Sequence, residues 1–513
     1  MRPVVSADVR LCNGLKRSVR SVPGRTLGSL LRGYSWKCCA ALCIIVLGIV
    51  DVAAAKQHNI LFILADDLAW SDLGCYGHPW HKTPSIDRLA AEGMRMTNGY
   101  APAPICSASR ASILTGKTTA RLGFEFVTKD KPGYQKIDDT TLLKAPPFTL
   151  DLPLQERTIA EHLGGLGYQT AFFGKWHLNQ HHGGYLGWSP THGPANQGFQ
   201  IAVQDFGAHP YSWKKSPPET IDQAGEYASD SMVDQVCEYL SQKHDQPFFA
   251  MAASFYVHTP VKTPCKWLLE SYDQTIPRDI PNRDKRVTYA AFLQTLDHHV
   301  GRILSALDAG GNRDDTFVVF MSDNGGHPEY VANAPLRGSK WNLYEGGIRV
   351  PMIARWPGRI EQGSTSDVPA IGYDLLPTFV DVAGGQVEDV DGVSIVPVLG
   401  GETSASDRIL LWHFPYYHPE SGYKDAKETI GVDDFRVSKT KPQSALRKGK
   451  HKLIWMAEED RVELYDLESD ISESNDLSSV DRPTANKLYR ELHLQLIHSR
   501  ARMATKQEPK REN

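Results

Sequence analysis

Apolar runs alternate with amphipathic segments through most of the chain. Largely apolar runs, typical of strands buried on both faces of a parallel sheet, occur at residues 58–65, 167–173, 247–256 and 316–321. Helices are predicted at residues 83–93, which open with Thr-Pro and close with Gly, and at residues 289–307, where apolar residues recur at helical spacing. Strands separated by helices predict an α/β fold, with a large, mostly parallel sheet sandwiched by helices.

The pattern changes near residue 400. Residues 450–455 and 462–467 indicate two antiparallel strands on either side of an acidic turn, and residues 483–499 predict a helix. The expected organisation is a main domain at 56–400, a smaller C-terminal α+β subdomain containing an antiparallel sheet at 401–500, and a charged, disordered tail at 501–513.

Two long segments of the main domain lack periodicity. Residues 124–158 and 179–220 are rich in Pro, Gly, His and Lys. We interpret them as loops over one face of the molecule, where binding specificity usually resides.

The N-terminal segment has the order of a targeting signal. Residues 1–37 hold eight Lys or Arg and a single acid, residues 38–50 are apolar, and small residues follow at 51–55. This order predicts a signal peptide with a long basic region at 1–55, and hence export to the periplasm or the extracellular space. An uncleaved membrane anchor is the alternative, although the apolar run is short for a span of about 20 residues. The sequence leaves the true start codon open.

Cysteine usage follows from the predicted export. Once the signal segment has left, Cys75, Cys106, Cys237 and Cys265 remain. If the reaction of the protein uses Cys106, an exported chain can form one disulfide from the other three cysteines. The sequence does not show which two would pair.

Composition narrows the function classes. Hydrophobic residues make up 41% of the chain and charged residues 23%, as in ordinary soluble proteins. The formal net charge of -4 provides no global basic field of the kind that nucleic-acid binding requires.

Acidic residues follow two of the predicted strands. Asp66 and Asp67 come directly after the first apolar run, and Asp323 and Asn324 after the run at 316–321. Carboxyl ends of parallel strands face the crevice where open α/β sheets bind ligands, and adjacent carboxylates suit a hard divalent cation. Helix capping explains the first pair about as well, and a plain turn would explain the second alone.

The segment from Cys106 to Gly116, CSASRASILTG, has small residues that suit the start of a helix. A helix N-terminus offers N–H groups and a positive dipole end to an anion. Arg110 lies four residues after Cys106, and therefore on the same helix face. A buried structural cysteine is the alternative interpretation.

Further cations and histidines stand near strand ends. Lys175 and His177 follow the run at 167–173, and in an extended chain they would point to one side. His258 follows the run at 247–256 and is a candidate general acid, and Lys340 lies in the segment from 338 to 351.

These motifs, in this order, resemble the sulfatase family over roughly residues 58–480. The resemblance implies that Cys106 is oxidised to formylglycine, whose hydrate attacks the sulfur of a sulfate ester. It also implies that Lys175 and Lys340 contact the sulfate, that His177 contacts the nucleophile, and that His258 protonates the leaving alcohol. The main domain would then be catalytic, with one calcium ion held by a set of five residues: Asp66, Asp67, Cys106, Asp323 and Asn324.

The resemblance leaves several points open. Ala108 stands where many members carry Pro, so the formylglycine-generating maturation enzyme is undetermined. A phosphomonoesterase or phosphonate hydrolase on the same scaffold, with two metals and a Thr or Ser nucleophile, is one rival, and a silent protein that binds sulfated glycans is another. The expected substrate is a sulfated carbohydrate or a small aryl sulfate. Its ring position, endo or exo action and the oligomeric state are not determined.

Overall fold

The computed structural model describes residues 57–513 apart from 214–216, 404–406, 421, 426–438 and 508–513. The predicted signal peptide at 1–55 lies outside the described residues and stays a prediction. Among the described residues, every helix is too short or too polar to cross a membrane.

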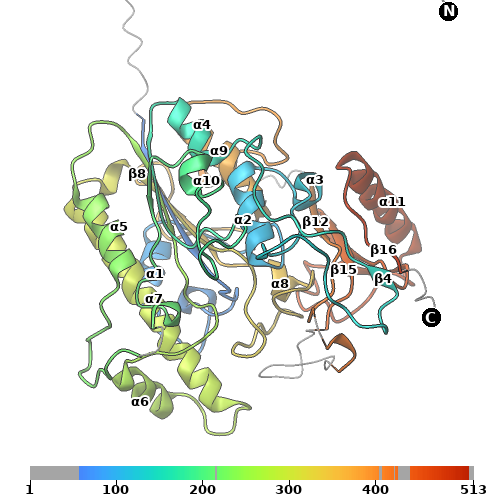
Figure 1. Ribbon diagram of the computed structural model, residues 1–513, viewed down its shortest axis with the longest axis horizontal. Helices are drawn as coiled ribbons and strands as arrows, with labels where there is room; N and C mark the ends of the chain where they lie inside the picture. The colour runs from blue at the N-terminus through green and yellow to red at the C-terminus, as the bar shows by residue number, and fades with distance from the viewer. Residues whose placement is uncertain (1–56, 214–216, 404–406, 421, 426–438, 508–513) are drawn as a thin grey trace, which may run out of the picture. The chain divides into compact units, whose positions relative to one another are not determined.

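The main sheet has eight strands in the order β10-β2-β9-β8-β1-β7-β5-β6. Figure 1 labels the central strand β8. Their bounds are β1 Asn59–Ala65, β2 Met94–Met96, β5 Gln169–Gly174, β6 Ile201–Val203, β7 Phe248–Ala253, β8 Thr316–Ser322, β9 Met352–Arg355 and β10 Ser364–Ser366. Every neighbouring pair is parallel except the two pairs that β9 makes with β2 and β8. The predicted mostly parallel sheet is therefore confirmed, with β9 as an antiparallel insertion.

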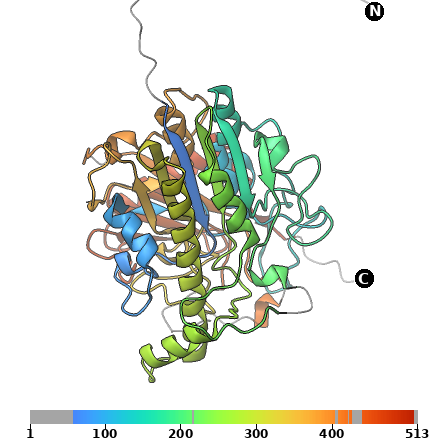
Figure 2. The ribbon, with the colours of Figure 1, turned by 90° about the vertical axis from the view of Figure 1, so that its left-hand side faces the viewer.

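Helices cover both faces of this sheet because its strands are apolar on both sides. In β1, Phe62 and Leu64 pack in one hydrophobic cluster, whereas Leu61 and Ile63 pack in the other. Helices α2, α4 and α9 contribute to the first cluster, and α1, α5 and α7 to the second; Figure 2 shows the long α7 running across the sheet. The bounds are α1 Pro84–Ala91, α2 Cys106–Thr115, α4 Ile159–Gly165, α5 Ser231–Ser241, α7 Arg283–Ala309 and α9 Leu375–Val382.

A second sheet follows near the C-terminus. Its strands pair antiparallel in the order β12-β13-β14-β15, with bounds β12 Ile409–Phe414, β13 Gln443–Lys448, β14 His451–Met456 and β15 Arg461–Asp466. Helix α11 (Arg482–His498) covers one face, where Leu488 and Leu492 pack against Leu453. The sequence predicted β14, β15 and α11, but not β12 or β13.

The other face of the second sheet packs on the segment that carries the start of α2. Trp412 of β12 shares a cluster with Tyr100, Ile105 and Ala108, and its indole N–H donates a 2.8 Å hydrogen bond to the carbonyl oxygen of Ala101. Residues 57–513 accordingly form one compact unit. The change of pattern near residue 400 marks the passage from one sheet to the other.

The predicted disorder of the tail is wrong for residues 501–507. Strand β16 (Thr505–Lys506) pairs antiparallel with β4 (Leu143–Lys144), and Gln507 N–H donates a 3.0 Å hydrogen bond to the carbonyl oxygen of Leu142. The Arg502 guanidinium also pairs with the buried Glu125. These contacts order the segment because they satisfy its backbone and its charge; residues 508–513 lie outside the described residues.

All four cysteines in the described part of the chain, Cys75, Cys106, Cys237 and Cys265, are unpaired. The disulfide that export would permit is therefore absent from the structure described.

Candidate active site

The acidic residues that follow β1 and β8 meet at the carboxyl end of the main sheet. Ala65 pairs with Ser322, so Asp66 and Asp323 leave neighbouring strands side by side, and both are fully buried. Asp67 has a φ of 63°, in the left-handed region, and its N–H donates a 3.3 Å hydrogen bond to Oδ1 of Asp323. The bend at Asp67 lets successive carboxylates reach the same site.

Cys106 is the first residue of α2, and no side chain caps this helix. All ten residues of the helix are buried. Burial raises the pKa of the Cys106 thiol to about 12, although Lys175 and Lys340 oppose the shift. An anion at this end of α2 would meet free backbone N–H groups and the positive end of the helix dipole.

Arg110, one turn after Cys106, holds α2 against the strand ends. Its Nε donates a 2.8 Å hydrogen bond to Oδ2 of Asp323, and one terminal nitrogen donates a 2.6 Å bond to the carbonyl oxygen of Lys175. The other terminal nitrogen lies 3.8 Å from Oδ1 of Asp66. Arg110 therefore ties the first turn of α2, which carries Cys106, to Asp323 and to the chain at Lys175.

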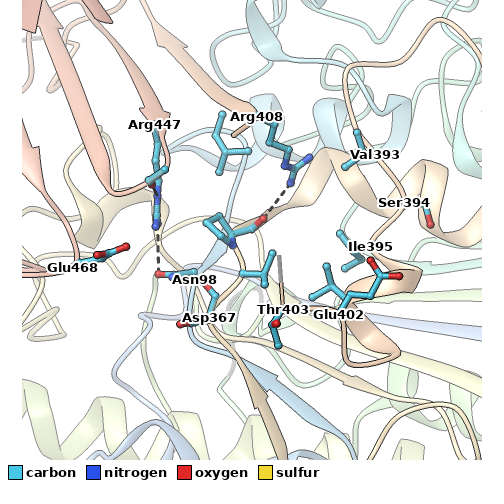
Figure 3. A pocket seen from close by; sticks show the side chains of 15 residues that line it. Asn98, Asp367, Val393, Ser394, Ile395, Glu402, Thr403, Arg408, Arg447 and Glu468 are labelled. Atoms are coloured by element: carbon cyan, nitrogen blue, oxygen red, sulfur yellow. Dashed lines mark hydrogen bonds between the residues drawn. The ribbon is translucent and has the colours of Figure 1, made fainter. Parts of the chain in front are cut away.

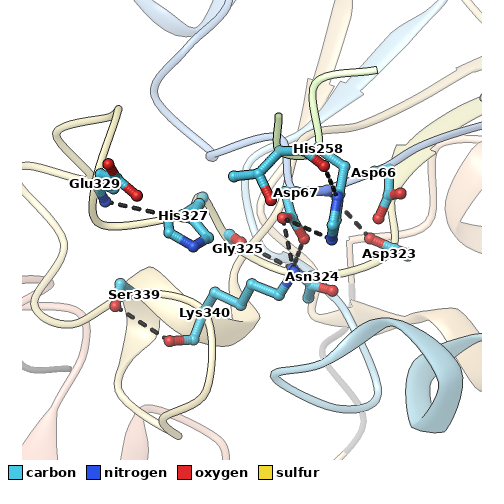
Figure 4. A network of polar contacts seen from close by, with 12 residues as sticks. Asp66, Asp67, His258, Asp323, Asn324, Gly325, His327, Glu329, Ser339 and Lys340 are labelled. Carbon is cyan, nitrogen blue, oxygen red and sulfur yellow. Dashed lines mark hydrogen bonds and ion pairs between the residues drawn. The ribbon is translucent and has the colours of Figure 1, made fainter. Parts of the chain in front are cut away.

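Two lysines reach the carboxylates from different strands. Lys175, directly after β5, pairs with Asp66, and Lys340, in the loop after β8, places Nζ 2.7 Å from Oδ2 of Asp67 (Figure 4). Burial alone would raise the pKa of Asp66, but the ammonium of Lys175, together with other cations nearby, holds that pKa well below its usual range. Both lysines are buried, and each has a carboxylate beside its ammonium group.

The extended geometry expected at Lys175 and His177 is wrong. His177 has a φ of 57°, so the backbone turns there instead of continuing as a strand. Both residues still reach the site: Lys175 pairs with Asp66, and His177 lines the cavity above Cys106. Nδ1 of His177 is buried without a hydrogen-bond partner among the described residues.

His258 points toward Asp67, with Nε2 lying 3.7 Å from Oδ2 of that carboxylate. Its Nδ1 lies 2.6 Å from the carbonyl oxygen of Thr259 and 2.9 Å from the hydroxyl oxygen of Tyr211. Burial, and then the charges of Lys340 and Lys175, lower the pKa of His258 well below its ordinary value. These contacts orient the ring so that Nε2 faces the site (Figure 4).

The donor set fits a hard cation. Ligand atoms of Asp66, Asp67, Cys106 and His258 lie within 4.8 Å of one another. Oδ1 of Asp66 and Oδ1 of Asn324 are buried and accept no hydrogen bond from the described residues. Carboxylate and amide oxygens are the ligands that calcium prefers. Both oxygens of Asp323 accept hydrogen bonds, from the Asp67 N–H and from Arg110, and both oxygens of Asp67 accept as well, from Asn324 and Lys340.

A cavity of about 210 Å³ opens above Cys106. Of the predicted residues, Cys106, His177, His258 and Lys340 line it. The lining residues that sequence reasoning missed include His181 and Tyr185 from the loop after β5, Lys129 and Trp341, and His418 and Glu420 from beyond β12. The only signal for these residues was the location of His181, Tyr185 and Lys129 in the segments interpreted as specificity loops.

A larger cavity, of about 450 Å³, lies elsewhere, beside β12 and β13 (Figure 3). Its two arginines are engaged: Arg408 donates a 2.7 Å hydrogen bond to Asp374, and Arg447 bonds to Asn98 at 3.4 Å. None of the predicted site residues lines this cavity, so the smaller one is the candidate active site.

Comparisons with known proteins extend over both sheets. A model of the sulfatase family matches residues 58–385, and one described as N-sulphoglucosamine sulphohydrolase, C-terminal, matches residues 339–502. Arylsulfatase A of Homo sapiens is 33% identical over 416 residues, covering 72% of this chain and 73% of the relative. A sulfatase of Formosa agariphila is 30% identical over 491 residues, covering 83% and 85%. The structure of Ps i-CgsB in complex with k-i-k-neocarrahexaose matches with a TM-score of 0.67 and 25% identity, covering 86% of this chain and 93% of that chain.

Proposed function

The chain belongs to the sulfatase family and is a sulfuric ester hydrolase, and on that premise we propose that it acts through a formylglycine made from Cys106, with one bound calcium ion. The substrate proposed is a sulfated carbohydrate or an aryl sulfate, and the protein is proposed to be exported. The predicted signal segment at 1–55 supports export.

The observation that carries the proposal is the position of Cys106. Cys106 stands at the uncapped N-terminus of α2 and lines the cavity together with Lys340. The ammonium of Lys175 is buried nearby, where it pairs with Asp66. A sulfate ester bound there would place its oxygens against two ammonium groups and the N–H groups of α2. The sulfur would lie above the residue proposed as nucleophile.

The proposed calcium ligands are Asp66, Asp67, Asn324 and residue 106, with Asp323 as the fifth. The unpartnered oxygens of Asp66 and Asn324 support this set. A hydrated formylglycine supplies a nucleophilic hydroxyl, and calcium supplies positive charge against the sulfate oxygens.

The other residues of the chain then have separate tasks. Lys175 and Lys340 neutralise sulfate oxygens, and Arg110 holds the first turn of α2 in place through Asp323. His258 faces the leaving oxygen with Nε2, while Nδ1–H donates to the carbonyl oxygen of Thr259. A proton on Nε2 therefore belongs to the imidazolium form, which the negative charge of a bound sulfate would favour. His177 faces the same cavity and accepts a proton from residue 106.

The names of relatives support the substrate classes. Arylsulfatase A is named for aryl sulfates, and Ps i-CgsB was solved with a neocarrahexaose, which is a carbohydrate. Both classes present a ring next to a sulfate ester, and the cavity has aromatic walls suited to a ring.

The test compares sulfate release with phosphate release from matching aryl esters. The protein is made together with a formylglycine-generating enzyme, mass spectrometry follows residue 106, and calcium is present. We expect sulfate release that Cys106→Ala abolishes. Cys237→Ala is the matched control, because Cys237 lies on α5 and does not line the cavity.

Two results would contradict the proposal. Faster release of phosphate than of sulfate would favour the phosphoesterase alternative. Sulfate release that survives in Cys106→Ala would remove the formylglycine from the mechanism, although the chain would remain a sulfatase.

A further inference from the structure

We propose that Tyr185 determines specificity by stacking on one monosulfated sugar ring at the end of a chain, and that Lys129 and Glu420 bind the hydroxyl groups of that ring. This inference deepens the proposed function and rests on it. It concerns the part of the cavity beyond the sulfate, where none of the predicted catalytic residues lies.

The size of the cavity limits the substrate to one ring. Its volume is about 210 Å³. Pockets that enclose drug-sized ligands range from about 300 to 1,000 Å³. Since Cys106 forms part of the cavity lining, the ring that carries the reacting sulfate fills most of this space. A ring at the end of a chain can fill this space while the rest of the chain stays outside, whereas an internal ring must also leave room for its second neighbour.

Tyr185 provides a platform at the mouth of the cavity. It is 54% exposed, which is unusual for a tyrosine that lines a concave site. Its ring meets His181, His177 and Tyr211 at interplanar angles of 84°, 68° and 70°, so all three contacts are edge-to-face. These contacts hold the ring while none of the three stacks on it, and a sugar ring can pack on an aromatic face of this kind.

The opposite wall is a preformed stack. Trp341 lies parallel to His418, with ring centroids 3.6 Å apart and an interplanar angle of 17°. The backbone N–H of Trp341 donates a 2.8 Å hydrogen bond to the carbonyl oxygen of Pro104, which joins this part of the lining to the chain just before Cys106. Tyr185 follows β5 and Trp341 follows β8, and these strands lie on opposite sides of β7 and β1 in the sheet. The two residues therefore reach the cavity from segments that leave the sheet on either side of the β1–β7 pair.

A balanced ion pair forms the polar part of the lining. Lys129 pairs with Glu420, and their side chains are 24% and 30% exposed. The Lys129 ammonium also lies 5.2 Å from the ring centroids of Phe126 and Phe148, so it has a fixed place. Because the pair is neutral overall, it offers no unbalanced charge to a second sulfate, whereas a carboxylate and an ammonium together can accept from and donate to neighbouring hydroxyl groups.

The experiment compares Tyr185→Ala with Tyr134→Ala, a control at a tyrosine that is 49% exposed and does not line the cavity. The probes are a hexose 6-sulfate, its disulfated form, and trisaccharides that carry the sulfate on the terminal or the internal ring. We expect Tyr185→Ala to raise KM for the hexose 6-sulfate by roughly 3- to 10-fold with kcat little changed, since a stacked ring contributes about that much to binding. Tyr185→Phe should recover the wild-type KM.

A second readout does not depend on turnover. Calorimetry on Cys106→Ala measures binding of the hexose 6-sulfate, and the double variant with Tyr185→Ala should bind more weakly by the same factor. Lys129→Met with Glu420→Gln should weaken binding of the hexose 6-sulfate more than binding of an aryl sulfate, because the aryl ring has no hydroxyl groups next to the ester.

The inference is overturned if Tyr185→Ala behaves like Tyr134→Ala in both readouts, or if internal and terminal sulfates are released equally fast. Wild-type hydrolysis of an aryl sulfate, lost in Cys106→Ala, separates these outcomes from failure of the proposed function. If that hydrolysis is absent although formylglycine is present, the proposed function fails. The stacking role of Tyr185 is then tested by calorimetry alone, and equal affinity of Cys106→Ala and of the double variant with Tyr185→Ala for the hexose 6-sulfate overturns it.

Discussion

Arg110 Nε lies 2.8 Å from Oδ2 of Asp323, and this bond joins the helix that carries Cys106 to the end of β8. The same guanidinium donates to the carbonyl oxygen of Lys175, so three segments far apart in sequence are held at one point. Arg110 and Asp323 are both buried. The positions of Cys106, the proposed nucleophile, and of a lysine proposed to bind sulfate therefore depend on one planar cation.

Arg110→Lys should lower kcat by about 100-fold, because an ammonium cannot reproduce the forked contacts of a guanidinium and a small displacement of reacting groups is costly. Aryl sulfate turnover measures the effect. Arg121→Lys is the control, since Arg121 pairs with Asp389 and Asp391 near the surface. Equal activity of the two variants would show that Arg110 does not position the site.

Calcium should stabilise the folded protein as well as support turnover. A ligand at 100 times its Kd adds about 2.7 kcal/mol to the free energy of unfolding. We expect EGTA to lower the melting temperature and the activity together, and added calcium to restore both. Asp67→Asn should abolish the calcium-dependent shift, whereas Asp222→Asn, at an exposed carboxylate, should preserve it. A wild-type melting temperature that is the same with EGTA and with added calcium would contradict the proposed calcium site.

Lys452→Met should destabilise the fold by about 3–5 kcal/mol, because it removes the ammonium from between two buried carboxylates and leaves Glu473 without its ion-pair partner. Lys452 Nζ lies 2.8 Å from an oxygen of Glu345 and 2.8 Å from an oxygen of Glu473, and all three side chains are fully buried. Denaturant unfolding measures the loss. The neighbouring Lys450→Met should leave the free energy of unfolding nearly unchanged, since Lys450 is exposed and solvent screens its pair with Asp466. Similar losses in the two variants would contradict a special role for the buried pair.

Stability should fall as the pH decreases below about 6.5, in part through His413. Burial lowers the pKa of His413 to about 4, and its ring nitrogens lie 2.8 Å from the hydroxyl oxygen of Ser444 and 3.1 Å from the carbonyl oxygen of Arg502. Between these two pKa values the unfolded chain holds a proton on His413 and the folded chain does not. The contribution of His413 to the free energy of unfolding is therefore complete above about pH 6.5 and is lost between about pH 6.5 and 4.

The measurement is the free energy of unfolding at pH 6 and pH 5. His413 should account for about 1 kcal/mol of the difference, so His413→Gln should show a flatter dependence than the wild type. His498→Gln, at an exposed histidine near the end of α11, is the control. An unchanged slope in His413→Gln would contradict the assignment.

Elements buried on both faces were predictable from the sequence because their hydrophobic pattern is local. The run that became β1 and the run that became β8 are continuous, and the parallel register then brings Asp66 beside Asp323. Strand β13 was missed because its sequence, QSALRK, is mostly polar and lacks a clear alternation of apolar and polar residues. It is a strand because β12 and β14 pair with it on both sides, which no local pattern reports.

The chemical residues were easier to predict than the residues that shape the cavity. Cys106, Lys340 and His258 stand next to strand ends or in distinctive motifs, whereas Tyr185 and Glu420 lie in loops without periodicity. Glu420 reaches the cavity only because the second sheet packs on the start of α2, and that packing depends on Trp412 fitting against Tyr100 and Ala108. Such long-range contacts are properties of the folded chain.

The packing of the second sheet on α2 also sets an order of events during synthesis. Cys106 ends 2% exposed, and Trp412 and Ala445, from the cluster that closes over the start of α2, are made much later. At about 5–20 residues per second, the ribosome needs roughly 15–60 s to pass from residue 106 to residue 412. During that interval the nascent segment around Cys106 lacks its final cover, so the proposed oxidation of Cys106 would have tens of seconds of access that the finished protein no longer offers.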